Sequence, residues 1–210
     1  LMVNEYSLTK ERGWLVLHSD PAQISPIQAE AVLAEGSLWL ERLQQRSGII
    51  PNQKIHIWLH VNTSRQQHYT GAKNVHFTLP KHREIHISST QIPHPTLGHE
   101  LAHVLLGQES STIWGLIGAY GILPNNGLNE ELAVFLTPEL MVSDELTMME
   151  QAAAIYRLGY LTEFASLFSV KPWSFWSYSP SRAYVMSGAL LQYLIQIKTK
   201  NLEEQKQLIK

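Results

Sequence analysis

The chain has 210 residues, of which 44% are hydrophobic and 16% charged, with a formal net charge of −2. This length is sufficient to bury a full hydrophobic core, and we expect one soluble globular domain. The near-zero net charge excludes the strongly basic surface that nucleic acids or anionic membranes attract, and the absence of cysteine excludes disulfides and thiolate metal sites.

The upstream half alternates between strand and helix patterns. Strands are expected at residues 13–19, 54–61, 75–79 and 84–89, and the last two are expected to pair as a hairpin. Between the first two strands, residues 23–47 have helical spacing. Their expected apolar face carries Ile27, Val32, Leu38, Trp39 and Leu43.

Residues 95–107 are expected to form the next helix. Pro95 suits a first helical position, because its fixed φ fits the helix and its missing N–H would have no partner there. Gly107 is expected to end the helix. Leu97, Leu101, Val104 and Leu105 predict an apolar stripe along one side of it.

This helix contains the segment His99-Glu100-Leu101-Ala102-His103. Residues four apart lie on one face of a helix, so His99 and His103 can direct imidazole nitrogens to one point. Two neutral imidazoles suit a zinc ion, and Glu100 beside them can take a proton from a zinc-bound water. The spacing therefore indicates metal-assisted hydrolysis with Glu100 as general base. Two ordinary histidines on a buried helix are the alternative, but a buried Glu100 would then need its own partner.

A catalytic zinc takes three protein ligands and a water, so a third ligand is required. Glu109 follows His103 by six residues, where the metzincin pattern has its last ligand, but Leu106 stands where that pattern needs a glycine. Glu130 is the other candidate. It lies far enough downstream for a loop and a second helix to bring it back to His103.

The segment Asn129-Glu130, followed by Ala133, gives the chain a resemblance to the gluzincin zinc metallopeptidases and their peptidase MA-like domains. In that family an Asn-Glu pair opens a second helix and the Glu binds zinc. The resemblance implies that Glu130 is the third zinc ligand, beside His99 and His103, and that Glu100 is the general base. Glu109 and Glu131 are then expected to face solvent or polar partners.

A later segment, Tyr184 to Gly188, resembles the Tyr-x-x-x-Gly pattern that opens a late helix in the same domains. The resemblance implies that Tyr184 is catalytic and stabilises the developing oxyanion. The chain departs from the family elsewhere. Glu131 stands where many relatives have glycine, and it competes with Glu130 for the ligand role, since the two side chains point about 100° apart. Val134 replaces an Asp that holds a ligand histidine in thermolysin-like enzymes.

Downstream of residue 107 we expect helices only, at 127–136, 144–158, 161–168 and 181–198. Strands followed by helices correspond to the α+β zincin arrangement, with an N-terminal mixed sheet, helices over the HExxH helix and a C-terminal all-helical lobe. We therefore expect a single zincin-like catalytic domain over 1–210, with an upper α/β lobe (1–107) and a lower helical lobe (108–210).

No apolar run reaches the length of about 18 residues that a membrane-spanning helix needs, and no signal peptide is visible. The glycine-broken apolar run 113–123 is expected to cover the active site, and the aromatic segment 173–178 to fill space between helices. Because the sequence begins Leu1-Met2, membrane association through segments outside this chain stays open. An extracytoplasmic or membrane-tethered location is favoured.

The sequence thus predicts a zinc-dependent peptidase, a hydrolase that cleaves a peptide or protein substrate with water activated by Glu100. The substrate is expected to lie extended along the sheet edge at residues 75–79. Two alternatives stay open: a catalytically silent zincin-scaffold binding protein that holds a protein partner in the cleft, and a hydrolase of other amides. The intact Glu100 favours an enzyme, because a scaffold has no need of a general base.

Overall fold

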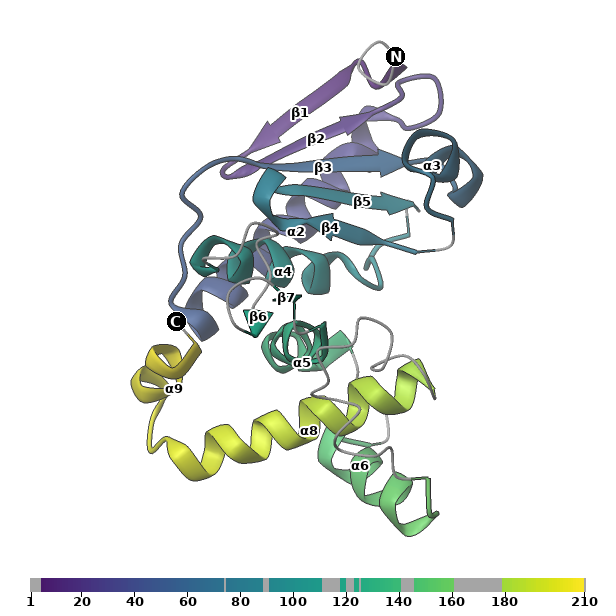
Figure 1. Cartoon of the computed structure of the whole chain (residues 1–210). Coiled ribbons are helices and arrows are strands. Elements are labelled where there is room, and N and C mark those ends of the chain that lie inside the picture. The colour runs from purple at the N-terminus through teal and green to yellow at the C-terminus, as the bar shows by residue number, and fades with distance from the viewer. Residues whose placement is uncertain are drawn as a thin grey trace.

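The computed structural model describes residues 5–73, 75–88, 91–110, 118–119, 123–124, 126–140, 146–160 and 179–209. These residues form an α+β fold with a mixed sheet, as the sequence predicted. The sheet has five strands, and the described residues contain seven α-helices. The sheet lies at one end of the molecule, and layers of helices follow it toward the other end (Figure 1).

The strands are arranged in the order β1-β2-β3-β5-β4. Their bounds are Leu8–Arg12 (β1), Leu15–Ser19 (β2), Ile55–His60 (β3), Phe77–Leu79 (β4) and Glu84–Ser88 (β5). β2, β3 and β5 run parallel, whereas β1 and β4 are antiparallel edge strands. The predicted hairpin of β4 and β5 is confirmed, and its turn is a short 3-10 helix over Pro80–His82. β1 was not predicted from the sequence.

One face of the sheet packs on helices α2 (Pro26–Ser47) and α4 (Leu97–Glu109). Ile55, Ile57 and Leu59 alternate along β3 and are fully buried on this face. Gly98 allows α4 to approach α2 closely, since a Cβ on it would lie 2.5 Å from the Trp39 ring. The core of the molecule therefore lies between the sheet and these two helices.

The expected helix at 23–47 begins later, at Pro26. Ser25 and Gln28 form a reciprocal capping box there, which satisfies the first backbone donors of the helix. The prediction of its apolar face is wrong for two residues, because Ile27 and Leu38 are 82% and 60% exposed. The buried stripe is narrower than the hydrophobicity pattern suggests.

The helix expected at 95–107 also has different ends. Thr96 is the N-cap of α4, so Pro95 precedes the helix, and Gly107 lies inside it, buried. The helix continues past Gly107 because Leu105 and Leu106 still pack in the core, and this packing outweighs the modest cost of a glycine in a helix.

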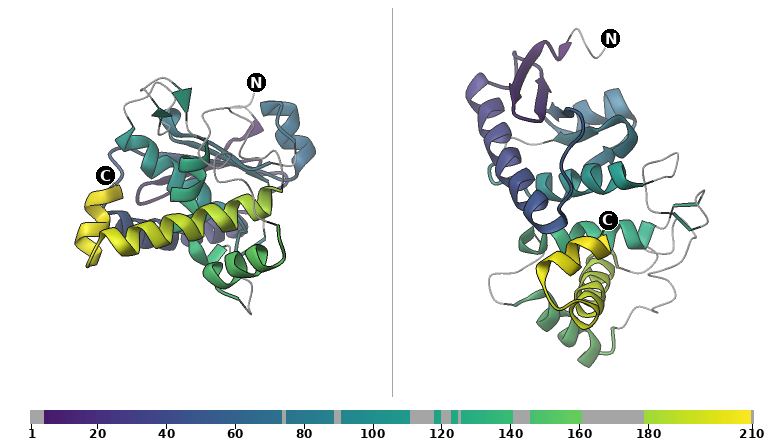
Figure 2. Two further views of the ribbon diagram at one scale, coloured as in Figure 1. Left: turned by 60° about the horizontal axis from the view of Figure 1, so that its bottom comes forward. Right: turned by 90° about the vertical axis from the view of Figure 1, so that its left-hand side faces the viewer.

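Below α4, helix α5 (Asn126–Leu136) packs between α4 and α8 (Pro180–Lys198), and α6 (Met148–Arg157) packs on α8. Helix α9 (Leu202–Ile209) returns from the end of α8 to contact α2, as the views in Figure 2 show. Predicted helices at 127–136, 144–158 and 181–198 correspond to α5, α6 and α8.

Other expectations for this half of the chain differ from the structure or fall on residues that it does not describe. A two-stranded ladder of β6 (Gly118–Ala119) and β7 (Leu123–Pro124) was not expected. The predicted helix 161–168 and the aromatic segment 173–178 lie outside the described residues, as does most of the apolar run 113–123. Among the described helices, none has the length and apolar character needed to cross a membrane.

The face of the sheet opposite α2 and α4 carries a group of histidine side chains. His18, His56, His60 and His86 lie on it, on β2, β3 and β5. Nitrogen atoms of His18 and His56 are 2.9 Å apart, and those of His60 and His86 are 3.2 Å apart. The Tyr6 hydroxyl and Nδ1 of His60 form a hydrogen bond at 2.5 Å. These imidazoles are therefore partners of one another within the sheet.

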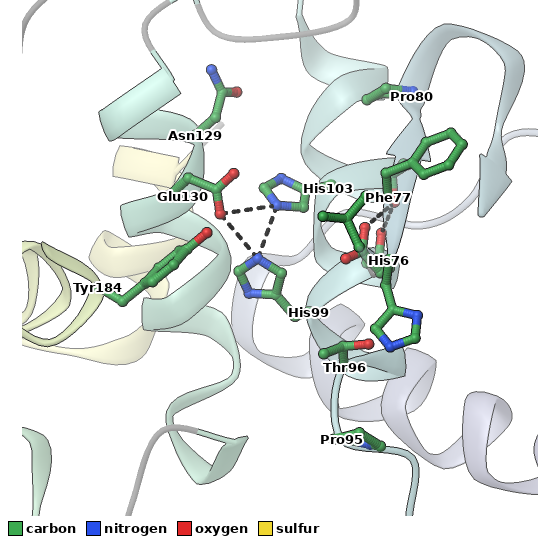
Figure 3. A pocket seen from close by; sticks show the side chains of 13 residues that line it. His76, Phe77, Pro80, Pro95, Thr96, His99, His103, Asn129, Glu130 and Tyr184 are labelled. Atoms are coloured by element: carbon green, nitrogen blue, oxygen red, sulfur yellow. Dashed lines mark hydrogen bonds and ion pairs between the residues drawn. The ribbon is translucent and has the colours of Figure 1, made fainter. Parts of the chain in front are cut away.

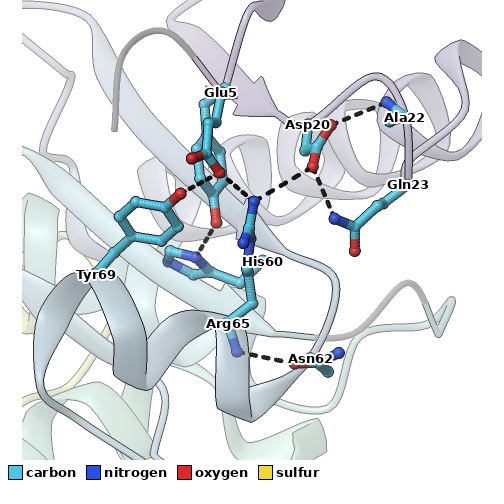
Figure 4. A network of polar contacts seen from close by, with 9 residues as sticks. Glu5, Asp20, Ala22, Gln23, His60, Asn62, Arg65 and Tyr69 are labelled. Atoms are coloured by element: carbon cyan, nitrogen blue, oxygen red, sulfur yellow. Dashed lines mark hydrogen bonds and ion pairs between the residues drawn. The ribbon is translucent and has the colours of Figure 1, made fainter. Parts of the chain in front are cut away.

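Helix α3 (Thr63–Thr70) closes the end of this face near His60. Arg65 on α3 pairs with Glu5 and lies 3.8 Å from Asp20, and Tyr69 donates a hydrogen bond to Glu5 (Figure 4). The network ties the segment before β1 to α3, on the side of the sheet away from α4.

Candidate metal centre

Three potential metal ligands from two helices converge at one point in the pocket (Figure 3). Nε2 of His99 lies 3.0 Å from Nε2 of His103 and 3.1 Å from Oε2 of Glu130. The same carboxylate oxygen lies 3.5 Å from Nε2 of His103. A tetrahedral zinc with bonds of about 2.0–2.1 Å separates neighbouring ligand atoms by about 3.3 Å. The three donor atoms therefore have the spacing that a bound zinc ion requires.

The orientation of the two imidazoles supports the same interpretation. The rings of His99 and His103 are nearly perpendicular, at 88°, and their centroids are 4.6 Å apart. With this short separation, the lone pairs of the two Nε2 atoms do not point at each other. Both Nε2 atoms instead lie beside the same carboxylate oxygen of Glu130, so the three donor atoms surround one position.

Burial makes the charge of this group important. The side chains of His99, His103 and Glu130 are only 10–16% exposed. Burial by itself would raise the pKa of Glu130, but His103 and then His99 outweigh it and hold that pKa well below its usual range. For His103 burial alone would lower the pKa. Glu130 and Glu100 raise it by more, so the net shift of the His103 pKa is upward. The carboxylates thus favour positive charge at this group, and a bound divalent cation would supply that charge directly.

Glu130 comes from the first turns of α5, the helix that packs on α4. Glu131 points elsewhere and is fully buried. Neither of its carboxylate oxygens has a hydrogen-bond partner within the described part of the chain, and burial raises its pKa to about 8. Our expectation that Glu131 would face solvent or polar partners is wrong. Glu109 is exposed at the end of α4 and is not part of the cluster.

Glu100 lines the same pocket and is buried, with only 6% of the residue exposed. The pocket has a volume of about 550 Å³ and includes His99, His103 and Glu130 on one side. On the opposite side it is bordered by residues 75–78, at the edge strand β4 (Figure 3). The three donors and the expected general base therefore open into one cavity beside the free edge of the sheet.

Tyr184 also borders the pocket, with its hydroxyl directed toward Glu130 in Figure 3. Its ring makes an edge contact with His99, at a centroid separation of 6.1 Å. Gly188 explains this placement, because a Cβ there would lie 2.6 Å from Val134 of α5 and 2.5 Å from Met148 of α6. The spacing Tyr-x-x-x-Gly thus lets α8 approach α5 closely while Tyr184, one turn earlier, reaches the pocket.

In many zinc sites the second ring nitrogen of a histidine ligand donates a hydrogen bond to a carboxylate or carbonyl. His99 differs from this arrangement. Nδ1 of His99 is buried and has no hydrogen-bond partner among the described residues. Val134, at the position of the Asp in thermolysin-like enzymes, packs in an apolar cluster with Met148, Val185 and Ala189. In the described part of the chain, the His99 ring is therefore oriented by packing and by the contacts of its Nε2 atom, and not by a hydrogen bond from Nδ1.

One residue at this site was missed by the sequence analysis. Thr78 of β4 donates a hydrogen bond to the Glu100 carboxylate, with Oγ1 2.7 Å from Oε2. The available signal was the strand alternation of residues 77–79, which places Thr78 on the opposite face from its neighbours. That pattern does not identify a contact with a helix 22 residues downstream.

Comparison with known proteins adds no assignment. No protein-family model matches the chain, and a search of curated proteins finds no match. The function is therefore inferred from the geometry of the site itself.

Proposed function

We propose that the protein is a zinc-dependent peptidase of the gluzincin type, with the zincin arrangement of a sheet lobe and a helical lobe on either side of the α4 helix. The observation that carries the proposal is the convergence of His99 Nε2, His103 Nε2 and Glu130 Oε2 in a pocket that also contains Glu100. Metal-ligating groups alone fit a structural site, but an adjoining cavity with a buried carboxylate fits hydrolysis.

His99, His103 and Glu130 would hold the metal through the three donor atoms described above. When bound, zinc supplies Lewis-acid activation of water and polarises a substrate carbonyl. Glu100 is the residue to accept the proton of the attacking water and to deliver it to the leaving amine. Tyr184 is in position to donate a hydrogen bond to the carbonyl oxygen as negative charge develops on it.

The edge strand supports a peptide as the substrate. Among the described residues β4 pairs with β5 on one side only, so its other side offers backbone groups for an added strand. Residues Val75, His76, Phe77 and Thr78 border the pocket that holds the metal ligands. An extended peptide paired with β4 would therefore pass beside the proposed zinc and Glu100.

An unbiased peptide library, read by mass spectrometry, tests the proposal. We expect cleavage by zinc-loaded protein, loss of cleavage after chelation, and recovery on adding zinc back. The Glu100→Gln variant prepared in parallel controls for contaminating peptidases. Zinc binding without any cleavage of peptides would contradict the peptidase proposal and favour the binding-protein alternative.

A further inference from the structure

The carboxylate of Glu100 has a specific hydrogen-bond partner in the edge strand. Thr78 Oγ1 lies 2.7 Å from Oε2 of Glu100 and 3.1 Å from the backbone oxygen of the same residue. Phe77 and Leu79, its neighbours in β4, alternate to the other face of the strand, where Phe77 stacks on His86. Thr78 is thus the side chain of β4 that is directed at α4.

A threonine hydroxyl has one hydrogen to donate, so its two possible acceptors compete. The carboxylate oxygen is closer, and hydrogen bonds to an ionised acceptor are about twice as strong as neutral ones. Glu100 is 6% exposed, so little water is available to replace this partner. The geometry therefore favours donation from Thr78 to Oε2.

We propose that Thr78 is a positioning residue for the general base. Its hydroxyl restrains the flexible Glu100 side chain and occupies Oε2, which leaves Oε1 to accept a proton. The restraint itself is a property of the folded chain, whereas its catalytic consequence rests on the proposed peptidase function. Because Thr78 belongs to the strand expected to pair with substrate, the same element would align the peptide and the base.

A double-mutant cycle on thermal unfolding tests the restraint without requiring activity. The full chain is compared as wild type, Thr78→Val, Glu100→Met and the double variant, all in the same zinc-containing buffer. We expect Thr78→Val to lower Tm by about 3–8 °C, because it leaves a buried carboxylate oxygen without its donor. In the Glu100→Met background the same change should lower Tm by less than a third of that amount.

An equal loss in both backgrounds would show that the hydroxyl serves the backbone oxygen of Glu100, and would overturn the proposal. So would the absence of any loss. Thr78→Ser is the matched control, since it keeps the hydroxyl and should retain most of the stability. If Thr78→Val does not fold, the cycle is run with Thr78→Ala, which removes the hydroxyl without adding an apolar group.

Kinetics on a cleaved peptide test the catalytic consequence. A misplaced catalytic group costs about 10–100-fold in rate, so we expect Thr78→Val to lower kcat by that factor. KM and zinc content should stay within about twofold of wild type, and Thr78→Ser should recover most of kcat. An unchanged kcat in Thr78→Val, or no recovery in Thr78→Ser, would refute the positioning role. A protein that cleaves no peptide would refute the proposed function, while the unfolding cycle would still decide the restraint.

Discussion

Two groups of histidines in this molecule have nearly the same nitrogen separations but different ring geometries. On the sheet, His18 and His56 are 2.9 Å apart through their nitrogens, and His60 and His86 are 3.2 Å apart. Their rings are nearly parallel, at 9° and 16°, and their centroids are 5.2 and 5.5 Å apart. Such wide centroid separations place the two nitrogens on the line between the rings, which is the geometry of an N–H···N hydrogen bond.

On α4, Nε2 of His99 and Nε2 of His103 are 3.0 Å apart, within the range of the sheet pairs. Here the rings are perpendicular and their centroids are only 4.6 Å apart, so the nitrogens do not face each other along one line. Glu130 closes the triangle from a second helix. Close imidazole nitrogens alone therefore do not define a metal site. The proposed site on α4 differs from the sheet pairs because a carboxylate oxygen lies beside both nitrogens.

The pKa shifts of the histidines also differ between the sheet and α4. Burial lowers the pKa of His60 to about 3 and that of His86 to about 4, so both rings are neutral at pH 7 and suited to mutual hydrogen bonds. The net shift of His103 is upward, because Glu130 and Glu100 outweigh the effect of burial. His60 and His86 thus form a neutral pair, whereas the carboxylates beside His103 favour positive charge at the group on α4.

The largest expected effect is on catalysis, which we assign to the α4 site and not to the sheet histidines. Glu100→Gln should keep zinc and lose turnover by at least about 10²–10⁴-fold, because the amide cannot accept the proton of water. Single-peptide cleavage rates with parallel zinc analysis measure this effect. Turnover equal to that of wild type would reject Glu100 as general base.

The third ligand is tested next. Glu130→Ala should weaken zinc affinity by more than about 100-fold, since even supporting residues behind a metal ligand contribute about 10–100-fold. Glu109→Ala and Glu131→Gln should stay within a few-fold of wild type, because neither carboxylate belongs to the cluster. Competition titration with a zinc chelator measures all three. The reverse ordering would assign the third ligand to another residue.

Zinc should also stabilise the fold through the site on α4 and α5, and not through the sheet histidines. At a free zinc concentration about 100-fold above Kd, binding contributes about 2.7 kcal/mol, which corresponds to a Tm increase of about 5–11 °C for a chain of this size. His103→Ala should abolish the increase, whereas His60→Gln should preserve it. A zinc-dependent increase that survives His103→Ala would place the ion elsewhere.

The smallest effect concerns pH and the sheet. The pKa of His60 is lowered on folding, so between about pH 3 and 6.5 the unfolded chain binds a proton that the folded chain does not. Its contribution to stability is complete above pH 6.5 and decreases as the pH falls, by about 2 kcal/mol at pH 5. Thermal unfolding of His60→Gln in chelator should therefore decline less steeply from pH 7 to pH 5 than that of wild type. Parallel slopes would contradict a neutral, buried His60.

The parts of the fold that follow from local periodicity were predictable from the sequence. Alternation along β3 identified Ile55, Ile57 and Leu59 as the buried face. Helical spacing likewise brought His99 and His103 to one side of α4. These relations depend on backbone geometry within a single element, which a short segment of sequence already determines.

Features that depend on packing between elements were not predictable in this way. Ile27 and Leu38 are exposed because the contact surface of α2 is narrower than its apolar face. The buried Glu131 and the contact of Thr78 with Glu100 depend on how α5 and β4 pack in three dimensions. No spacing rule along one element encodes such contacts, so they required the structure.

The most direct test of the central claim is the zinc content of protein purified without chelator and then exposed to zinc, measured by elemental analysis. The wild type and His60→Gln are each expected to hold one zinc per chain, and His103→Ala none. A wild-type protein without bound zinc, or one zinc retained by His103→Ala, would contradict a metal centre formed by His99, His103 and Glu130.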